Sequence, residues 1–307
     1  MDLSQLRTLR QVAELGSLSR AADRLRIAQP ALSRQIRLLE EELGTPLFER
    51  HGRGMVITEA GAKVLAHALR IMAEVDEIRA EVSDASGRLT GRLVIGMPPT
   101  IGEIITVPLV RVFRREHPQL ELSFVSAFSG YLMDWQQRGE LDLAVLYDPQ
   151  TTRALRTRPL LLESFFLIAG PDSGLAPGSV LRFAELASWS LVLPGPRHAM
   201  RTIFQRCAQE AGISLNVPIE VDSLAGMKDL VRGGYGATLL PLAPLHEDVA
   251  QGRLTAAALT DPLPTRRMAL TFAGDRPITR AARYAADAIA SIVADKVRRG
   301  VWSGQLL

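Results

Sequence analysis

The stretch Gln29-Pro-Ala-Leu-Ser-Arg-Gln-Ile-Arg37 decides the fold of the N-terminal part of the chain. Apolar residues recur through it and beyond it at the spacing that lines one side of a helix, at Leu32, Ile36, Leu39 and Leu43. The opposite face collects Gln29, Pro30, Ser33, Arg34 and Arg37. Proline is tolerated in the first turn because the N–H there has no partner within the helix. The pattern therefore predicts a helix with one buried stripe and one polar, basic face.

The polar face carries the side chains that are needed to contact base edges in DNA. Arginine can bond to guanine through two donors, glutamine can bond to adenine, and serine can bond to either base. The N-terminus of a helix also attracts phosphate. Residues 20–37 hold five arginines and one acid, a local charge of 5 − 1 = +4. These features favour a DNA-contacting helix over the alternative, a solvated basic face on an ordinary helical bundle.

Two shorter segments precede this helix. Apolar residues at helical spacing predict a first helix that starts at Leu3 and is ended by Gly16. Ser17 is a suitable N-cap for a second helix over Leu18–Leu25. Because only a short turn separates the second helix from the third, the predicted arrangement is a helix-turn-helix.

Residues 46–57 predict a hairpin next to the helices. Two short apolar strands flank a turn with two glycines, and three basic residues lie at its tip: Arg50, His51 and Arg53. Positive charge at such a tip can contact phosphates or enter the minor groove. We therefore expect a winged helix-turn-helix DNA-binding domain over residues 1–58.

Residues 59–86 predict a single long helix, for which Thr58 is a suitable N-cap. Apolar residues follow at steps of 4, 3, 4, 3 and 4, which make a heptad seam, at Val64, Ala68, Ile71, Val75, Ile78 and Val82. These 28 residues would span roughly 42 Å. Such a helix would pair with its own copy and place two DNA-binding domains about one DNA turn apart. The alternative is a long helix that packs along its own domain.

Glycines at 87 and 91 end the helical pattern, and short apolar strands then alternate with helices. This alternation predicts βαβ units and a parallel sheet. It occurs in two similar blocks, so we expect two Rossmann-like subdomains with a cleft between them. The predicted fold class is α+β with several domains: 1–58, a dimerising linker helix at 59–87, and 88–307, with subdomain I at about 91–163 and 268–300 and subdomain II at about 164–267.

Composition sets further limits. The chain has 307 residues, of which 47% are hydrophobic and 22% are charged, as is ordinary for a globular protein. A single cysteine, Cys207, excludes an intramolecular disulfide and any multi-cysteine metal site. No run approaches the ~18 apolar residues of a membrane span, and the polar N-terminus lacks the apolar core of a signal peptide. We expect a cytoplasmic protein that has no membrane partner.

Together these features resemble the LysR-type transcriptional regulators. The residues that carry the resemblance are Leu3–Ala13, Gly16–Ala22, Ala28–Ile36, Leu38, Glu40, Leu43, Gly44, Leu47, Phe48, Arg50 and Thr58–Gly61. Gly236–Pro241 is the clearest later signature, and Leu141–Tyr147 and Pro98–Leu109 resemble the nitrogen-assimilation-control branch. The family usually has serine or threonine where this chain has Ala28. The side-chain cap of the third helix is therefore expected to be absent.

The resemblance implies a transcriptional regulator that binds promoter DNA as a homotetramer of two dimers and responds to a small effector. It also implies that residues 88–307 form an effector-binding domain like that of periplasmic binding proteins. RNA polymerase is a further candidate partner, and neither a cofactor nor a metal is expected.

Ligands of open α/β sheets lie beyond the carboxyl ends of strands. The residues at such positions here are Pro98, Thr100, Ile101, Ser126, Phe128, Ser129, Tyr147, Arg197 and His198. Thr100 could cap the next helix and present donors to an anion, and Arg197 suits a carboxylate. We therefore expect a small organic anion or an amino-acid-like effector. The structural alternatives are caps for Thr100 and His198, an ion pair between subdomains for Arg197, and core positions for Phe128 and Tyr147.

Two other classes of protein fit the sequence less well. The chain has no Gly-x-Ser-x-Gly, His-Glu-x-x-His or P-loop motif, and Gly233–Gly236 precedes a strand instead of opening a helix. An enzyme is therefore not expected. A periplasmic solute-binding protein would suit the C-terminal two-thirds, but the polar N-terminus and the helix-turn-helix argue against it.

Overall fold

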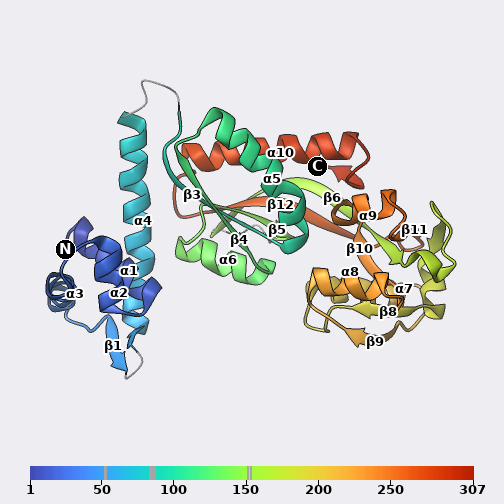
Figure 1. The fold of residues 1–307 in the computed structure, drawn as a ribbon, viewed down its shortest axis with the longest axis horizontal. Coiled ribbons are helices and arrows are strands. Elements are labelled where there is room, and N and C mark those ends of the chain that lie inside the picture. Colours follow the sequence, from blue (N-terminus) through green and yellow to red (C-terminus); the bar gives the residue numbers. More distant parts are fainter. Residues whose placement is uncertain (52–53, 83–87, 151, 153) are drawn as a thin grey trace.

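The structure is a computed structural model that describes residues 1–51, 54–82, 88–150, 152 and 154–307. Helices and a hairpin form an N-terminal unit, and a long helix leads from it to a larger α/β part (Figure 1). In Figure 1 the N-terminal unit stands at the left, and the α/β part extends to the right in two lobes. The predicted fold class, a helix-turn-helix followed by an α/β module, is confirmed.

Three helices build the N-terminal unit at the predicted positions: α1 (Leu3–Leu15), α2 (Leu18–Leu25) and α3 (Gln29–Leu43). Ser17 caps α2 by accepting a hydrogen bond from the backbone N–H of Arg20, whereas Ala28 gives α3 no side-chain cap. Leu32, Ile36 and Leu39 are buried in a core shared with α1 and α2. Leu43 is 38% exposed, so its predicted burial is wrong: the last turn of α3 lies outside this core.

The predicted hairpin is present as β1 (Phe48–His51) and β2 (Gly54–Ile57), which pair antiparallel. The Glu40 carboxylate fixes its start by accepting hydrogen bonds from the backbone N–H groups of Leu47 at 2.7 Å and Phe48 at 3.2 Å. Gly54 has a φ of +138°, and a Cβ atom there would collide with the carbonyl oxygen of Gly16. Glycine is therefore required where the hairpin meets the end of α1.

The long helix α4 (Glu59–Val82) begins as predicted, because Thr58 Oγ1 accepts a hydrogen bond from the N–H of Gly61 at 2.9 Å. Its 24 residues span about 36 Å, and residues 83–86 of the predicted helix lie outside the described residues. Ile71 and Ile78 of the predicted seam are 40% and 55% exposed, as a pairing surface requires. Ala68 is instead buried in the N-terminal core. The seam prediction is wrong there, because the first half of α4 completes its own domain's core.

Among the described residues, the α/β part is built on a nine-stranded sheet. Its strands are β3 (Gly91–Met97), β4 (Leu120–Ser126), β5 (Leu143–Tyr147), β6 (Leu155–Ala169), β7 (Val180–Arg182), β10 (Thr238–Pro241), β11 (Thr255–Thr260), β12 (Thr265–Ala273) and β13 (Gly304–Leu306). β3 pairs in parallel with β4 and β5, but β12 pairs antiparallel with β5 and β6, and β10, β11 and β13 also run antiparallel to β6. The prediction of a parallel sheet is therefore wrong for the strands around β6. The alternation of strands and helices in a sequence does not show that a long strand such as β6 passes from one lobe to the other and pairs antiparallel with its neighbours.

Helices and a second small sheet complete the α/β part. They are α5 (Pro99–Glu116), α6 (Ser129–Arg138), α7 (Ala199–Glu210), α8 (Leu224–Arg232), α9 (His246–Ala250) and α10 (Arg280–Arg298), with the parallel pair β8 (Ser190–Leu193) and β9 (Asn216–Glu220). Apolar residues of β3, α5, β5 and α10 gather in one core, and those of α7, α8, β8 and β10 gather in another. β6 passes from the first core at Leu161 to the second at Phe165. We call the lobe of the first core subdomain I and the lobe of the second subdomain II.

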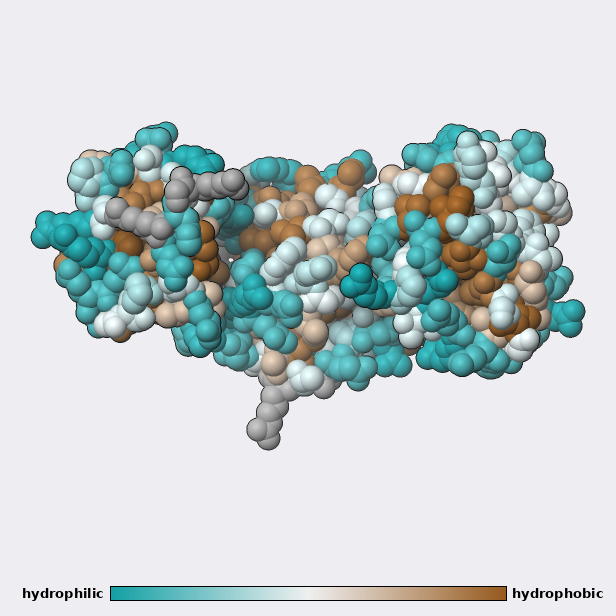
Figure 2. Space-filling view, turned by 90° about the horizontal axis from the view of Figure 1, so that it is seen from below, coloured by the Kyte–Doolittle hydropathy of each residue, from teal (hydrophilic) through white to brown (hydrophobic). Residues whose placement is uncertain are grey.

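The surface is mixed in character. Figure 2 shows it from below, with hydrophilic residues over most of it and apolar patches on both the N-terminal unit and the α/β part. Among the described helices, none combines the length and the apolar character needed to cross a membrane.

Candidate DNA-binding surface and effector cleft

The outward face of α3 is accessible in this structure. Gln29, Pro30, Arg34 and Arg37 are exposed and Ser33 is half-buried. Arg37 has a long ion pair of 3.4 Å with Glu41 on the same helix. All five arginines of residues 20–37 are exposed, so the positive charge that the sequence places here does lie at the surface. The face is thus polar, basic and uncovered, while the other side of the same helix is fixed in the core.

Polar contacts that the sequence did not single out hold α3 against the other two helices. Gln35 accepts a hydrogen bond from the Thr8 hydroxyl and donates one to Ser4 Oγ at 3.0 Å, which ties the middle of α3 to α1. Ser19 Oγ on α2 donates to Gln29 Oε1 at 3.3 Å. Thr8 is 1% exposed although it is polar. A polar residue at the apolar spacing of α1 was the one sequence signal for the Gln35 contact.

The tip of the hairpin is described in part. His51 is exposed and lies 3.4 Å from the Glu49 carboxylate, measured from Nε2 to Oε2. Arg53 and the side chain of Arg50 are outside the described residues. Their predicted contact with the DNA backbone therefore stays a prediction.

Thr100, Tyr147 and Ser129 come together in subdomain I, and Phe128, next to Ser129, contacts subdomain II. Thr100 Oγ1 lies 2.9 Å from the Tyr147 hydroxyl, and Ser129 Oγ accepts a hydrogen bond from the backbone N–H of Tyr147 at 3.1 Å. Burial raises the pKa of the Tyr147 phenol, so this group stays protonated and can donate. Thr100 is the second residue of α5, whose N-cap is Pro98. The expectation that Thr100 caps this helix is wrong, because its hydroxyl is bonded to Tyr147.

Next to Tyr147 lies a buried ion pair that the sequence analysis did not predict. Arg266, at the start of β12, donates from Nη2 to the Tyr147 hydroxyl at 2.7 Å and from Nε to Glu163 on β6 at 2.6 Å. The side chains of Arg266 and Glu163 are 4% and 1% exposed. Trp302 completes the set by donating from Nε1 to the other Glu163 oxygen at 2.7 Å. A chain of polar side chains therefore runs from Tyr147 through Arg266 and Glu163 to Trp302 near the C-terminus.

His198 and Arg197 lie next to each other in subdomain II, at the start of α7, and His198 contacts subdomain I. His198 Nδ1 accepts a hydrogen bond from the backbone N–H of Met200 at 3.2 Å and so caps α7. Its ring stands edge-on to Phe128 of subdomain I, with centroids 4.8 Å apart. Burial lowers the pKa of His198, which keeps the ring neutral near pH 7. Arg197 is exposed and has no ion-pair partner among the described residues.

The remaining predicted effector residues differ in their exposure. Pro98 is buried, and Ile101 is fully buried in the core of subdomain I. Ser126 is exposed at the end of β4. Direct contact between an effector and Ile101 would therefore need this core to open, whereas Ser126 is accessible as it stands.

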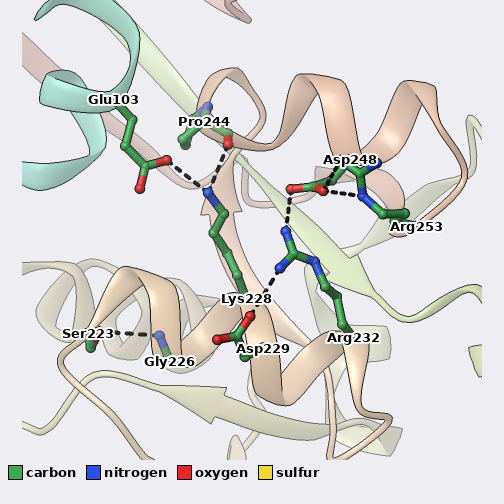
Figure 3. A network of polar contacts seen from close by, with 9 residues as sticks. All are labelled: Glu103, Ser223, Gly226, Lys228, Asp229, Arg232, Pro244, Asp248 and Arg253. Carbon is green, nitrogen blue, oxygen red and sulfur yellow. Dashed lines mark hydrogen bonds and ion pairs between the residues drawn. The ribbon is translucent and has the colours of Figure 1, made fainter.

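A second contact between side chains joins the two subdomains. Lys228 of α8 donates to the Glu103 carboxylate of α5 at 2.8 Å and to the carbonyl oxygen of Pro244 at 3.3 Å (Figure 3). In Figure 3 the Lys228 side chain points away from its own helix toward Glu103. This ion pair and the Phe128–His198 contact are thus two side-chain contacts that join the subdomains, in addition to strand β6, which runs through both.

Comparison with known proteins agrees with this geometry. Residues 3–62 match the model of the bacterial regulatory helix-turn-helix protein of the lysR family, and residues 86–292 match the model of the LysR substrate binding domain. The chain belongs to the LysR family of transcriptional regulators. As a member of this family it is a DNA-binding regulator with an effector-binding domain that works as an oligomer.

Several relatives of this LysR-type regulator are similar over most of their length. The HTH-type transcriptional regulator BbuR of Bordetella bronchiseptica is 33% identical over 99% of this chain and 94% of its own. The nitrogen assimilation regulatory protein nac of Klebsiella aerogenes is 32% identical over 78% of each chain. The structure of a full-length OxyR variant from Pseudomonas aeruginosa is 27% identical, covers 94% of both chains and has a TM-score of 0.77. Relatives with different names thus have similar identities, which supports the family more firmly than one branch of it.

Proposed function

We propose that the outward face of α3 contacts base edges in the major groove, with Gln29, Ser33 and Arg34 as the base-contacting residues. Pro30 and Arg37 flank this group on the same face. The observation that carries the proposal is the combination of an exposed basic face with a buried stripe on one helix. Rigid anchoring matters because each good contact to a base edge depends on a fixed direction of the side chain. Arg50, His51 and Arg53 of the hairpin would contact the DNA backbone.

We propose that the effector binds between the two subdomains. Subdomain I would contribute the hydroxyls of Thr100, Ser129 and Tyr147, and subdomain II would contribute Arg197 and His198. Arg266 is already paired with buried Glu163, whereas Arg197 is exposed and has no ion-pair partner among the described residues, so we assign the anionic group of the effector to Arg197. This arrangement suits a small organic anion or an amino-acid-like molecule. An effector of this kind can regulate only if its affinity differs between two arrangements of the subdomains.

The chemistry of the single thiol argues against one mode of regulation. Some relatives are named hydrogen peroxide-inducible genes activators, and one solved OxyR of Corynebacterium glutamicum is an oxidized form. Here Cys207 is 4% exposed on α7, and burial raises its pKa, which disfavours the reactive thiolate. With one cysteine among 307 residues the chain forms no intramolecular disulfide. We infer that binding of an effector, and not disulfide formation within the chain, is its signal.

The remaining functional assignments follow the same logic. We propose a division of labour among residues 1–58, 59–87 and 88–307, with α4 as the dimerising element and a tetramer as the assembly on DNA. We also propose that the protein acts in the cytoplasm, regulates transcription through contact with RNA polymerase, and carries no catalytic activity.

The DNA-binding proposal is tested with Arg34→Ala. Affinity for the protein's own upstream site and for a scrambled duplex would be measured by fluorescence anisotropy, with Arg114→Ala on the α/β part as control. Loss of a base contact should cost about 1–3 kcal/mol on the specific site and leave binding to scrambled DNA almost unchanged. An equal loss on both duplexes would show that Arg34 contacts phosphate instead.

The effector proposal is tested by calorimetry on the full chain with a panel of small carboxylates and amino acids. A ligand of this class should bind the unmodified protein and lose affinity on Arg197→Ala and on Thr100→Val. Binding that neither substitution weakens would place the effector site elsewhere.

A further inference from the structure

Gln29 is the first residue of α3 and lacks the usual support of a helix start. Ala28 precedes it and forms no side-chain cap, and Pro30 follows it without an N–H group. The residue before Ala28, Ile27, is 37% exposed, and Arg26 has a left-handed backbone with φ +56°. The local backbone therefore offers Gln29 little that would fix the direction of its side chain.

Ser19 supplies that support from the neighbouring helix. Its Oγ lies 3.3 Å from Gln29 Oε1, and both residues are exposed on the side of α3 that we assign to DNA. Ser19 itself is firmly placed: Ser17 caps the start of α2, and Ala21 and Ala22 are buried in the core. The contact thus joins an otherwise unsupported amide to an anchored helix.

We propose that Ser19 is a positioning residue that sets base preference through Gln29. When the serine hydroxyl donates to Oε1, the Gln29 amide presents its NH₂ group outward as a donor. A donor in the major groove finds N7 and O6 of guanine, N7 of adenine and O4 of thymine, whereas the amino groups of adenine and cytosine offer no acceptor. Ser19 thereby biases Gln29 toward acceptor positions and away from the two-bond contact with adenine, because an Oε1 that is turned toward Ser19 does not face the base edge together with the NH₂ group.

The hydrogen bond is long and exposed in the free protein, so it contributes little to the stability of the fold. On DNA the surrounding water is displaced and the bond lies between the protein and the duplex. Its effect should therefore appear in sequence preference and not in unfolding. This inference rests on the proposed base contact of Gln29, and the experiment separates the two.

The test compares base-preference profiles from binding to a randomised duplex library for the unmodified chain, Gln29→Ala, Ser19→Ala and the double variant. Gln29→Ala first identifies the base position that Gln29 contacts. Ser19→Ala should then change preference at that position alone, by about two- to tenfold, as expected from one hydrogen bond. It should have no further effect in the Gln29→Ala background. Ser19→Thr, which keeps the hydroxyl, should retain the original preference.

Ala28→Ser separates positioning from a structural role. This substitution restores a cap to α3 without touching the Gln29 amide. It should not rescue the profile of Ser19→Ala. Rescue by Ala28→Ser would overturn the inference, since Ser19 would then only secure the helix start.

Two further results would also decide the matter. A loss on Ser19→Ala that is equal at all sequences and persists in the Gln29→Ala background would assign Ser19 to phosphate and refute the positioning role. If Gln29→Ala changed no base position at all, the proposed base contact of Gln29 would itself fail, which the first profile reveals before Ser19 is considered.

Discussion

The buried pair of Glu163 and Arg266 gives the most quantitative prediction for the α/β part. In Glu163→Gln the shape of the side chain is kept, but Arg266 loses its counter-charge while it remains 4% exposed. Removal of one partner of a buried ion pair costs about 3–5 kcal/mol, because the other charge is left without compensation. Arg266 keeps its 2.7 Å bond to the Tyr147 hydroxyl, so we expect the lower end, about 3 kcal/mol.

The chain offers a matched control in Asp287→Asn. Arg158 and Asp287 are 2.6 Å apart, like the buried pair, but their side chains are 50% and 64% exposed. Loss of this pair should cost less than about 1 kcal/mol. Urea unfolding followed by tryptophan fluorescence suits the comparison, since Trp135, Trp189 and Trp302 all lie in the α/β part. A second Arg266→Met substitution should recover most of the loss. Equal costs for Glu163→Gln and Asp287→Asn, or no recovery in the double variant, would refute the reasoning.

Three further predictions concern the hairpin, the end of α5 and helix α4. Gly54→Ala should lower the free energy of unfolding by at least about 2 kcal/mol, because it adds a clash with Gly16 to a positive φ. Gly44 also has a positive φ but open space around it, so Gly44→Ala should cost only about 1 kcal/mol. Equal shifts of the melting temperature in the two variants would contradict this. Burial lowers the pKa of His117, whose Nδ1 accepts from the N–H of Leu89, so the folded chain binds fewer protons than the unfolded one. Stability should therefore fall as the pH drops below about 6.5. In urea titrations at pH 7.5 and 5.5, His117→Asn should reduce the difference in the free energy of unfolding between the two pH values. An unchanged difference would contradict the prediction. Ile78 is exposed in the single chain and would be buried in the dimer, so Ile78→Asp should weaken self-association about tenfold or more in sedimentation. Glu74→Lys, one turn away on the same helix, should not weaken it. Unchanged self-association of Ile78→Asp would show that α4 is not the interface.

The N-terminal unit could be predicted almost entirely because its signals are local. Caps such as Ser17 and Thr58 and the apolar spacing of α3 act within a few residues, and each was found where expected. The error at Leu43 arose because periodicity shows which side of a helix is apolar but not how far the core extends. The error at Ala68 has a similar origin, since one apolar stripe can serve either a partner or the helix's own domain.

The contacts around Thr100, Tyr147 and Arg266 were harder to predict because they join distant parts of the chain. Glu163 and Arg266 are 103 positions apart, and nothing near either residue marks the other as its partner. The first half of β6 has no continuous apolar pattern in the sequence, because it contains Arg156, Arg158 and Pro159. Without that half, neither the antiparallel pairing with β12 nor the buried ion pair could be inferred. The position of Thr100 after the first strand of the α/β part was predicted, but its hydrogen-bond partner Tyr147 comes from another strand and could not be predicted.

The central claim, that the outward face of α3 enters the major groove, is tested most directly by disulfide trapping. Ser33→Cys would be incubated with a series of duplexes, each of which carries a thiol tether on one base edge in the major groove. Glu74→Cys on α4 would serve as the control. The native Cys207 is buried and should stay unreactive. We expect rapid trapping of Ser33→Cys at one or two adjacent base pairs of the specific site and none for Glu74→Cys. Absence of trapping at every base pair of a bound site, or the same yield from both variants, would contradict the claim.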